Sequence, residues 1–290
     1  MDVLTALNQS PWLLLTSLLL LGLCIGSFLN VVIYRLPLMM ESRWRRDCCE
    51  LLEIDREKQE APLNLATPNS HCPHCKAAIK PWQNIPLLSY LLLGGKCSVC
   101  AQPISTRYPL LELTTGLMTM ILAWYFQLSP ALLGAVIFTW SLIALTMIDI
   151  DHQLLPDDIT LPLLWLGLLL NLNATYVSLP EAVIGAMAGY LILWGVYQVF
   201  RLLTGKEGMG YGDFKLLAAL GAWMGWQALP LIILLSSLVG AIMGIAMMII
   251  KRRGRDIPIP FGPYLAMAGW IALLWGDDIM ARYLGVMGTP

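Results

Sequence analysis

The chain has 290 residues, of which 58% are apolar and only 13% are charged, and its mean hydropathy is +0.68. Soluble globular proteins carry about 45–50% apolar and about 25% charged residues. The composition therefore excludes a soluble domain, a disordered tail and a nucleic-acid-binding protein. Lysines and arginines nearly balance the acids, 18 against 19, so net charge indicates no partner. No lysine or arginine occurs between Arg107 and Arg201. Such a long stretch without basic residues is typical of lipid-facing helices and predicts an all-α polytopic membrane protein.

Eight segments are candidates for membrane-spanning helices, which need about 20 mostly apolar residues each. Five are strongly apolar: Pro11–Tyr34, Leu110–Leu128, Ala131–Ile148, Ala182–Phe200 and Leu229–Ile250. Three are weaker: Ile159–Val177, Phe214–Trp226 and Phe261–Trp275. Pro130, Pro180 and Pro230 lie in the gaps, where helices are expected to stop.

The positive-inside rule orients these spans. With eight spans and the N-terminus outside, all lysines and arginines except Arg282 fall on the inner side. The inner segments are then 35–108, 149–158, 201–215 and 251–260. If 214–226 were a re-entrant loop instead, the basic cluster at 251–255 would move outside. Eight spans with both termini outside is therefore the prediction.

The first span is predicted to be a retained anchor rather than a secretory signal. No basic residue precedes it, and Gly26-Ser27-Phe28-Leu29-Asn30 continues directly into the apolar stretch before Arg35. A signal peptide needs a basic segment first and a small-residue cleavage site afterwards.

The inner segment 35–108 contains two Cys-x-x-Cys pairs, Cys72/Cys75 and Cys97/Cys100, with 21 residues between them. Two such turns can supply four thiolates to one tetrahedral Zn²⁺ ion. Disulfides are the alternative, but the predicted cytosolic side is reducing. Four cysteines close the site, so we expect a structural zinc that helps a small loop domain to fold.

The remaining candidates for ligands are weaker. His71 and His74 lie beside the first cysteine pair and could substitute for a thiolate. Cys24, Cys48 and Cys49 are expected to be free thiols.

Two clusters of acids lie at predicted helix ends, where charged groups in a lipid setting are costly and often functional. The first runs from Asp149 to Asp158, with four carboxylates and no lysine or arginine. The second is Gly208-Met209-Gly210-Tyr211-Gly212-Asp213, in which three glycines precede an acid that opens an apolar helix. Two carboxylates brought together share a proton, so one can activate water while the other protonates a carbonyl oxygen.

Other interpretations of these acids stay open at this point. Asp213, Asp157 or Asp158 could simply cap helices, and Asp151 could be solvated. Ion- or proton-coupled transporters also use intramembrane acids. Serine, cysteine and zinc proteases are not indicated, because the chain has no Gly-x-Ser-x-Gly, no His-Glu-x-x-His and only three histidines.

Taken in order along nearly the whole chain, the motifs resemble those of type IV prepilin peptidases. They are Gly26–Val32 with Arg35-Leu36-Pro37, the two cysteine pairs, Arg107–Glu112, Asp149-Ile150-Asp151-His152, Gly208–Asp213 and Pro260–Tyr264. The resemblance implies a bifunctional enzyme of the bacterial inner membrane. Such enzymes remove the short basic leader of prepilins and pseudopilins, then methylate the new N-terminal residue with S-adenosylmethionine.

The resemblance implies a Gly-x-Gly-Asp aspartyl protease whose catalytic acids are Asp149 and Asp213, with Asp151 as a competing candidate. The acidic segment 149–158 could attract the basic leader. Gly94 and Gly95 are the best local candidates for the methyl-donor site, although an ordinary tight turn explains them equally well. Pro260-Phe261-Gly262-Pro263 could border the protease cleft without a catalytic role.

The prediction divides the chain into a first transmembrane helix (1–34), a cytosolic zinc loop domain (35–108) and a membrane aspartyl protease domain (109–290). Expected partners are prepilin and pseudopilin substrates, the lipid bilayer and the type IV pilus or type II secretion machinery, with no nucleic acid. The alternative is an ion- or proton-coupled transporter with a regulatory zinc loop. A structural scaffold of the secretion apparatus is a third reading, but it leaves the glycine-flanked Asp213 unexplained.

Overall fold

The structure is a computed structural model that describes residues 10–54, 64–251 and 260–287. Within these ranges the regular structure is helical, and β pairing is limited to two isolated bridges, His71–Ala78 and Lys96–Pro103. The chain divides into two compact units, residues 1–132 and 133–290. Most of the predicted basic inner segment 251–260 lies outside the described residues.

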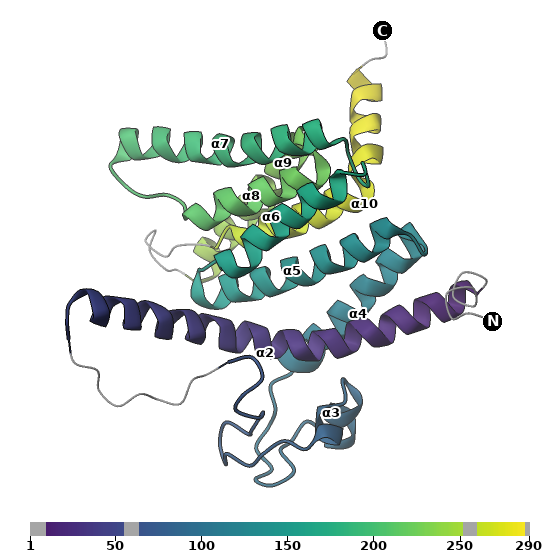
Figure 1. Cartoon of the computed structure of the whole chain (residues 1–290), viewed down its shortest axis with the longest axis vertical. Coiled ribbons are helices and arrows are strands. Elements are labelled where there is room, and N and C mark those ends of the chain that lie inside the picture. The colour runs from purple at the N-terminus through teal and green to yellow at the C-terminus, as the bar shows by residue number, and fades with distance from the viewer. Residues whose placement is uncertain (1–9, 55–63, 252–259, 288–290) are drawn as a thin grey trace. The chain divides into compact units, whose positions relative to one another are not determined.

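The N-terminal unit is built on two long helices that frame the cysteine loop. Its helices are α2 (Pro11–Leu51), η1 (Pro81–Asn84), α3 (Leu88–Leu92) and α4 (Arg107–Phe126). The first predicted span was expected to end at Tyr34, but α2 continues as one helix of 41 residues with Pro37 inside it (Figure 1). At 1.5 Å per residue this helix is about 62 Å long, about twice the thickness of a hydrocarbon core.

Glycines allow α2 and α4 to pack closely within this unit. A Cβ at Gly26 would lie 2.7 Å from the Cα of Glu112, and one at Gly22 would lie 2.9 Å from the Cα of Gly116. Small residues at such crossings let helix backbones approach in membranes, where packing rather than hydrophobicity drives association. The two helices that flank the cysteine loop are therefore held together along their length.

The C-terminal unit is a bundle of six α-helices in the described residues. They are α5 (Pro130–His152), α6 (Asp157–Asn171), α7 (Leu179–Thr204), α8 (Tyr211–Met224), α9 (Leu229–Lys251) and α10 (Gly262–Met287), with the short η2 (Trp226–Ala228) before α9. Helix α8 packs against α6, α7 and α10 (Figure 1). Most of its residues are buried, as expected for a helix that is apolar on every side.

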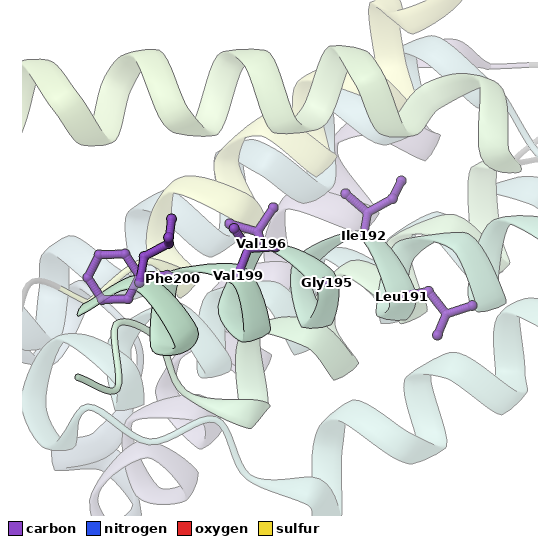
Figure 2. Close-up of a pocket in the computed structure, with 7 residues that line it drawn as sticks. Leu191, Ile192, Gly195, Val196, Val199 and Phe200 are labelled. Atoms are coloured by element: carbon purple, nitrogen blue, oxygen red, sulfur yellow. The ribbon is translucent and has the colours of Figure 1, made fainter. Parts of the chain in front are cut away.

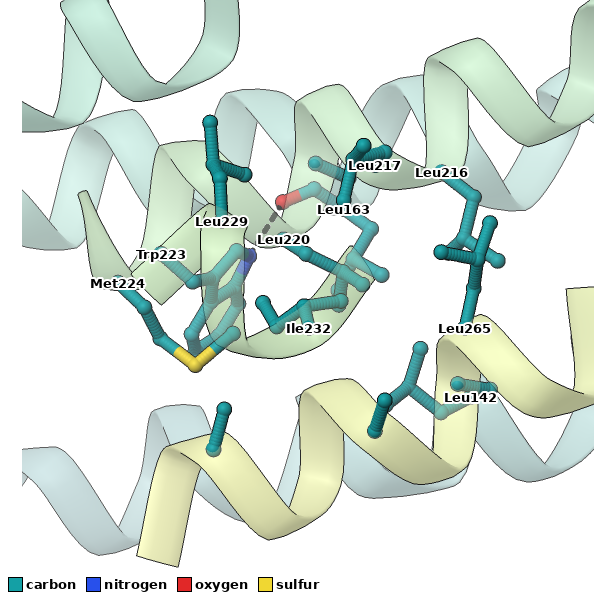
Figure 3. Close-up of a cluster of buried hydrophobic side chains, with 14 of the residues drawn as sticks. Leu142, Leu163, Leu216, Leu217, Leu220, Trp223, Met224, Leu229, Ile232 and Leu265 are labelled. Atoms are coloured by element: carbon teal, nitrogen blue, oxygen red, sulfur yellow. Dashed lines mark hydrogen bonds between the residues drawn. The ribbon is translucent and has the colours of Figure 1, made fainter. Parts of the chain in front are cut away.

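The core of this unit is centred on Trp223, whose side chain is fully buried. Its indole Nε1 donates a hydrogen bond of 2.8 Å to the carbonyl oxygen of Leu163 on α6 (Figure 3). Its ring also contacts the rings of Phe138 and Tyr176. At the C-terminal end of α6, the Asn171 amide donates to the carbonyl oxygens of Ala222 and Trp223. These contacts join α6 to the C-terminal end of α8.

The helical content and apolarity confirm an all-α, multi-pass membrane protein. Each of the eight predicted spans corresponds to a helix, and five segments are long and apolar enough to cross a membrane: Pro11–Leu51, Arg107–Phe126, Pro130–His152, Leu179–Thr204 and Trp226–Ala246. Helices α6 and α8 have only 15 and 14 residues, and α10 is not among the five. The number of spans therefore stays a prediction.

Candidate functional site

Two buried carboxylates lie at one end of the C-terminal unit. Asp149, in the last turn of α5, is 5% exposed, and Asp213, in the first turn of α8, is 7% exposed. Leu155 links their surroundings, because a Cβ at Gly212, which precedes Asp213, and a Cβ at Gly262, which binds Asp149, would both meet its side chain. The structure thus brings together the two acids that the sequence singled out, although 64 positions separate them in the chain.

The glycines before Asp213 explain how α8 begins. Gly210 is the N-cap residue, with extended backbone angles, and the helix starts at Tyr211. Asp213 therefore lies inside the first turn and is not the N-cap that one reading of the sequence expected. A Cβ at Gly212 would lie 2.8 Å from the Cβ of Leu155. Glycine at this position lets the segment that follows α5 approach the start of α8.

The surroundings of the two carboxylates differ. The backbone N–H of Gly262, the first residue of α10, donates a hydrogen bond of 3.0 Å to Oδ2 of Asp149. Oδ1 of Asp213 is buried and has no hydrogen-bond partner among the described residues. A buried polar atom without a partner is costly. This oxygen is consequently available to a proton, a water molecule or a substrate group.

The other acids of the 149–158 segment differ from this pair. Asp151, the competing candidate, is exposed, as are Asp157 and Asp158. The expected capping by Asp157 or Asp158 is also wrong, because Pro156 is the N-cap of α6 and the acids follow it. Segment 149–158 contains no lysine or arginine, but Lys215 of α8 forms an ion pair with its Asp157 at 2.7 Å.

The four cysteines of the N-terminal unit form a second candidate site. Their sulfur atoms all lie within 4.8 Å of one another. Cys72 and Cys100 have sulfurs 3.8 Å apart, and those of Cys75 and Cys97 are 4.0 Å apart. Thiolates at about 2.3 Å from a tetrahedral zinc ion would be about 3.8 Å apart. The donor set therefore fits zinc in both chemistry and spacing.

The two cysteine turns have the same backbone pattern. Cys72 N–H donates to the Ala77 carbonyl and Cys97 N–H to the Gln102 carbonyl, both at 2.9 Å. In the second turn, backbone N–H groups, first that of Cys100 and then that of Val99, lower the pKa of the Cys97 thiol to about 6. Backbone N–H groups also lower the pKa of Cys72. These N–H groups thus favour the metal-binding thiolate form at Cys72 and Cys97. At Cys100, the N–H of Gln102 is outweighed by burial and by hydrogen bonds to the neighbouring thiols, which raise the pKa to about 11.

Comparison with known proteins agrees with this combination of sites. The profile of the type IV leader peptidase family matches residues 136–245. That of the bacterial peptidase A24 N-terminal domain matches residues 20–126. The chain belongs to the type IV leader peptidase family. The first match contains both buried acids, and the second contains the four cysteines.

Relatives in this leader peptidase family match almost the whole chain. A prepilin leader peptidase/N-methyltransferase of Stutzerimonas stutzeri is 56% identical, over 96% of each chain. The relative of the same name from Pseudomonas aeruginosa is 55% identical over 99% of each chain. The one from Aeromonas hydrophila is 58% identical over 94% of this chain and 95% of the relative. No solved structure matches the chain. None of these comparisons supports the transporter alternative.

The Gly94-Gly95 segment, the predicted methyl-donor candidate in this leader peptidase, forms a turn after α3. Both glycines have positive φ, 58° and 68°, which favours glycine. Gly95 N–H donates to the carbonyl of Tyr90, and a Cβ at Gly95 would lie 2.9 Å from the Tyr90 hydroxyl. Backbone geometry alone therefore accounts for this pair of glycines.

Two buried charges of the leader peptidase motifs attach the cysteine loop to the long helices. The Arg35 guanidinium donates to the carbonyl oxygens of Asn64, Leu65 and Pro68. On α4, the Glu112 carboxylate accepts the N–H of Leu87 at 2.9 Å. Sequence reasoning used both residues as family markers but gave them no role. Their contacts indicate that they orient the loop.

An apolar pocket of about 590 Å³ lies along α7 (Figure 2). Its lining residues are Leu191, Ile192, Gly195, Val196, Val199, Phe200 and Leu203. It holds no charged or polar side chain, so it offers no group for peptide cleavage or methyl transfer.

Proposed function

We propose that the chain removes the leader of type IV prepilins and pseudopilins and then methylates the new N-terminus, with S-adenosylmethionine as the methyl donor. Membership of the leader peptidase family and the names of its near-full-length relatives support both activities. One observation carries the peptidase assignment: two buried carboxylates from distant parts of the chain lie at one end of the bundle, both next to elements that meet Leu155.

In the proposed mechanism, Asp149 and Asp213 act as a pair. Two interacting carboxyl groups in a buried site hold one proton more readily than none. The ionised member accepts a proton from a water molecule as that water attacks the scissile carbonyl carbon. The protonated member donates to the carbonyl oxygen, so the tetrahedral intermediate forms without a covalent bond to the enzyme. The unpartnered Oδ1 of Asp213 is a suitable contact for the water or the carbonyl oxygen.

We place the reaction at the cytosolic face of the bacterial inner membrane. The distribution of lysines and arginines supports this orientation, because seventeen of 18 fall on the predicted inner segments. Exposed acids such as Asp151 and Asp158 would lie near the basic leader of a prepilin. Type IV pilus and type II secretion systems are the expected users of the product.

We further propose that Cys72, Cys75, Cys97 and Cys100 bind a structural zinc ion within the domain 35–108. All four positions of a tetrahedral ion would be occupied by thiolates, so the metal would stabilise the loop rather than activate water. In this proposal the membrane-spanning part of α2 within segment 1–34 anchors this domain, and segment 109–290 is the protease domain. The closeness of the four sulfur atoms, all within 4.8 Å of one another, supports this assignment.

The proposal is tested by the intact mass of a prepilin co-expressed with the chain. The unaltered chain should remove the leader and add one methyl group, whereas Asp149→Asn and Asp213→Asn should leave the precursor at full length. Asp151→Asn serves as the matched control, because it removes a nearby exposed acid. If Asp151→Asn abolishes cleavage and Asp149→Asn does not, the first catalytic acid is wrongly assigned. An uncut precursor with the unaltered chain would refute the function.

A further inference from the structure

The start of α10 lies directly against Asp149. Gly262 is the first residue of this helix, and its N–H donates to Oδ2 of Asp149 at 3.0 Å. The N-terminus of a helix carries partial positive charge and unsatisfied N–H groups, so it favours a carboxylate at this place. Asp149 is 5% exposed, which leaves its carboxyl group few other partners.

Gly262 also leaves the space that this carboxylate occupies. A Cβ at position 262 would lie 2.6 Å from Oδ2 of Asp149 and 3.2 Å from the carboxyl carbon. Real Cβ atoms do not approach other heavy atoms so closely, so any side chain at position 262 would displace the carboxylate. The hydrogen bond from Gly262 and the absence of a side chain there thus both keep the Asp149 carboxylate in the same position.

Leu155 connects this contact to the second acid. Its side chain, 7% exposed, would lie 3.0 Å from a Cβ at Gly262 and 2.8 Å from a Cβ at Gly212. Gly212 directly precedes Asp213. One leucine therefore fills the space between the two glycines that adjoin the two acids.

We propose that Gly262 is a positioning residue of the peptidase site: its N–H orients the Asp149 carboxylate toward Asp213, and the absence of a side chain keeps that carboxylate in place. Leu155 fixes the separation between Gly262 and Gly212. This inference rests on the proposed function, because it concerns the geometry of the same acid pair. It gives the Pro260-Phe261-Gly262-Pro263 motif a role in catalysis that no sequence pattern assigned.

The test is a kinetic comparison of Gly262→Ala with the unaltered chain, using a prepilin in proteoliposomes. A displaced carboxylate misaligns the attack on the peptide bond, so kcat for leader removal should fall about 100-fold with little change in KM. Methylation of a pilin whose leader has already been removed should continue, which shows that the variant is folded. Gly276→Ala, in the same helix, is the matched control, because its Cβ would meet only an ordinary contact at 3.7 Å.

A double variant separates carboxylate displacement from simple overpacking. Leu155→Ala removes the leucine atoms that the new methyl group at position 262 would meet, but it leaves the clash of that methyl group with Asp149. We expect the double variant to cleave far less than Leu155→Ala alone, because the clash of the new methyl group with Asp149 remains. Restored cleavage would overturn the proposal, because the defect would then come from packing against Leu155.

Two further outcomes would also overturn it. Normal kcat in Gly262→Ala refutes the inference alone, since the unaltered chain then still establishes the peptidase. A parallel loss of cleavage, methylation and thermal stability would assign Gly262 to folding only. If the unaltered chain does not cleave the prepilin, the proposed function fails and this inference fails with it.

Discussion

Asn171 shows how a single polar residue can organise the interior of this membrane protein. Its side chain is fully buried at the end of α6. The amide donates to two carbonyl oxygens at the end of α8, and its oxygen accepts the N–H groups of Tyr176 and Val177 at 3.0 and 3.2 Å. Both N–H donors and both acceptor positions of this side-chain amide are thus used.

Asn171→Ala should therefore destabilise the chain more than an ordinary surface change. It leaves buried backbone groups without partners, which costs about 2 to 3 kcal/mol. Thermal unfolding in detergent should show a lower midpoint. Asn173→Ala is the control, because Asn173 is exposed two residues later and should change stability by less than about 0.5 kcal/mol. Equal midpoints for the two variants would contradict this role of Asn171.

Residues whose signal is local could be predicted from the sequence, and those that depend on distant contacts could not. The cysteine pairs and the glycines before Asp213 stand within a few positions of one another, and the structure gathers both groups. The contact of Gly262 with Asp149 joins residues 113 positions apart. Its geometry depends on how α10 meets α5, which no local pattern encodes.

At the scale of elements, α7 and α8 pack through their backbones. A Cβ at Gly185 would meet the carbonyl oxygen of Gly221, and one at Gly189 would lie 2.6 Å from the carbonyl oxygen of Leu217. The contacts run in opposite directions along the two helices, so α7 and α8 are antiparallel. Backbone atoms cannot move aside as side chains do.

Gly185→Ala and Gly195→Ala should have opposite effects on stability. The first forces α7 away from α8 and should cost about 1 to 3 kcal/mol. The second meets no atom within 4 Å and gains about 0.5 to 1 kcal/mol of helix propensity. Thermal unfolding of the two variants in the same detergent provides the comparison. A stabilised Gly185→Ala would show that the two helices can separate without cost.

The two cysteine turns form an element whose metal content can be measured. Purified protein should contain about one zinc ion per chain, and Cys97→Ser should lose it together with the stability of the loop. Cys24→Ser, which alters an exposed cysteine on α2, should retain the metal. Elemental analysis of the three proteins decides this. Equal zinc contents, or none in the unaltered chain, would exclude the proposed site.

Element boundaries were less predictable than element number. Hydropathy marks where the lipid-facing stretch ends, so it places the end of the first span at Tyr34. Helix α2 nevertheless continues to Leu51, because the polar residues that follow are also good helix formers. Similarly, the acid at position 213 could be predicted to lie near a helix start, but Gly210 takes the capping position. In both cases backbone preferences of neighbouring residues decide the boundary.

At the scale of the whole molecule, the number of membrane crossings depends on whether the short helices α6 and α8 span the bilayer. Helix α6 meets α8 at both ends, through Asp157 with Lys215 and through Asn171 with Ala222. The start of α7 also meets η2, just after α8, because Gln227 donates to Glu181 at 2.8 Å. These contacts align α6 and α8 with the part of α7 between Glu181 and Tyr197, and the count of eight crossings stays a prediction.

Cysteine labelling in spheroplasts tests this topology. Asn173→Cys, between α6 and α7, should react with a membrane-impermeant maleimide added from outside. Lys206→Cys, between α7 and α8, should react only after the membrane is permeabilised. The unaltered chain controls for labelling of native cysteines. If both introduced cysteines react from outside, α7 does not cross the membrane and the predicted orientation is wrong.

The enclosure of α8 determines which part of the site can move. Its residues from Asp213 to Met224 are almost all buried, and Phe214, Leu216, Leu217 and Leu220 are fully buried. Opening such a helix to solvent requires the bundle around it to come apart. Its amide hydrogens should exchange with deuterated water more slowly than those of the other helices, as mass spectrometry of the peptides can show. Asp213 then stands on a rigid support, and a substrate peptide has to be accommodated by movement of the elements around α8 rather than of α8 itself.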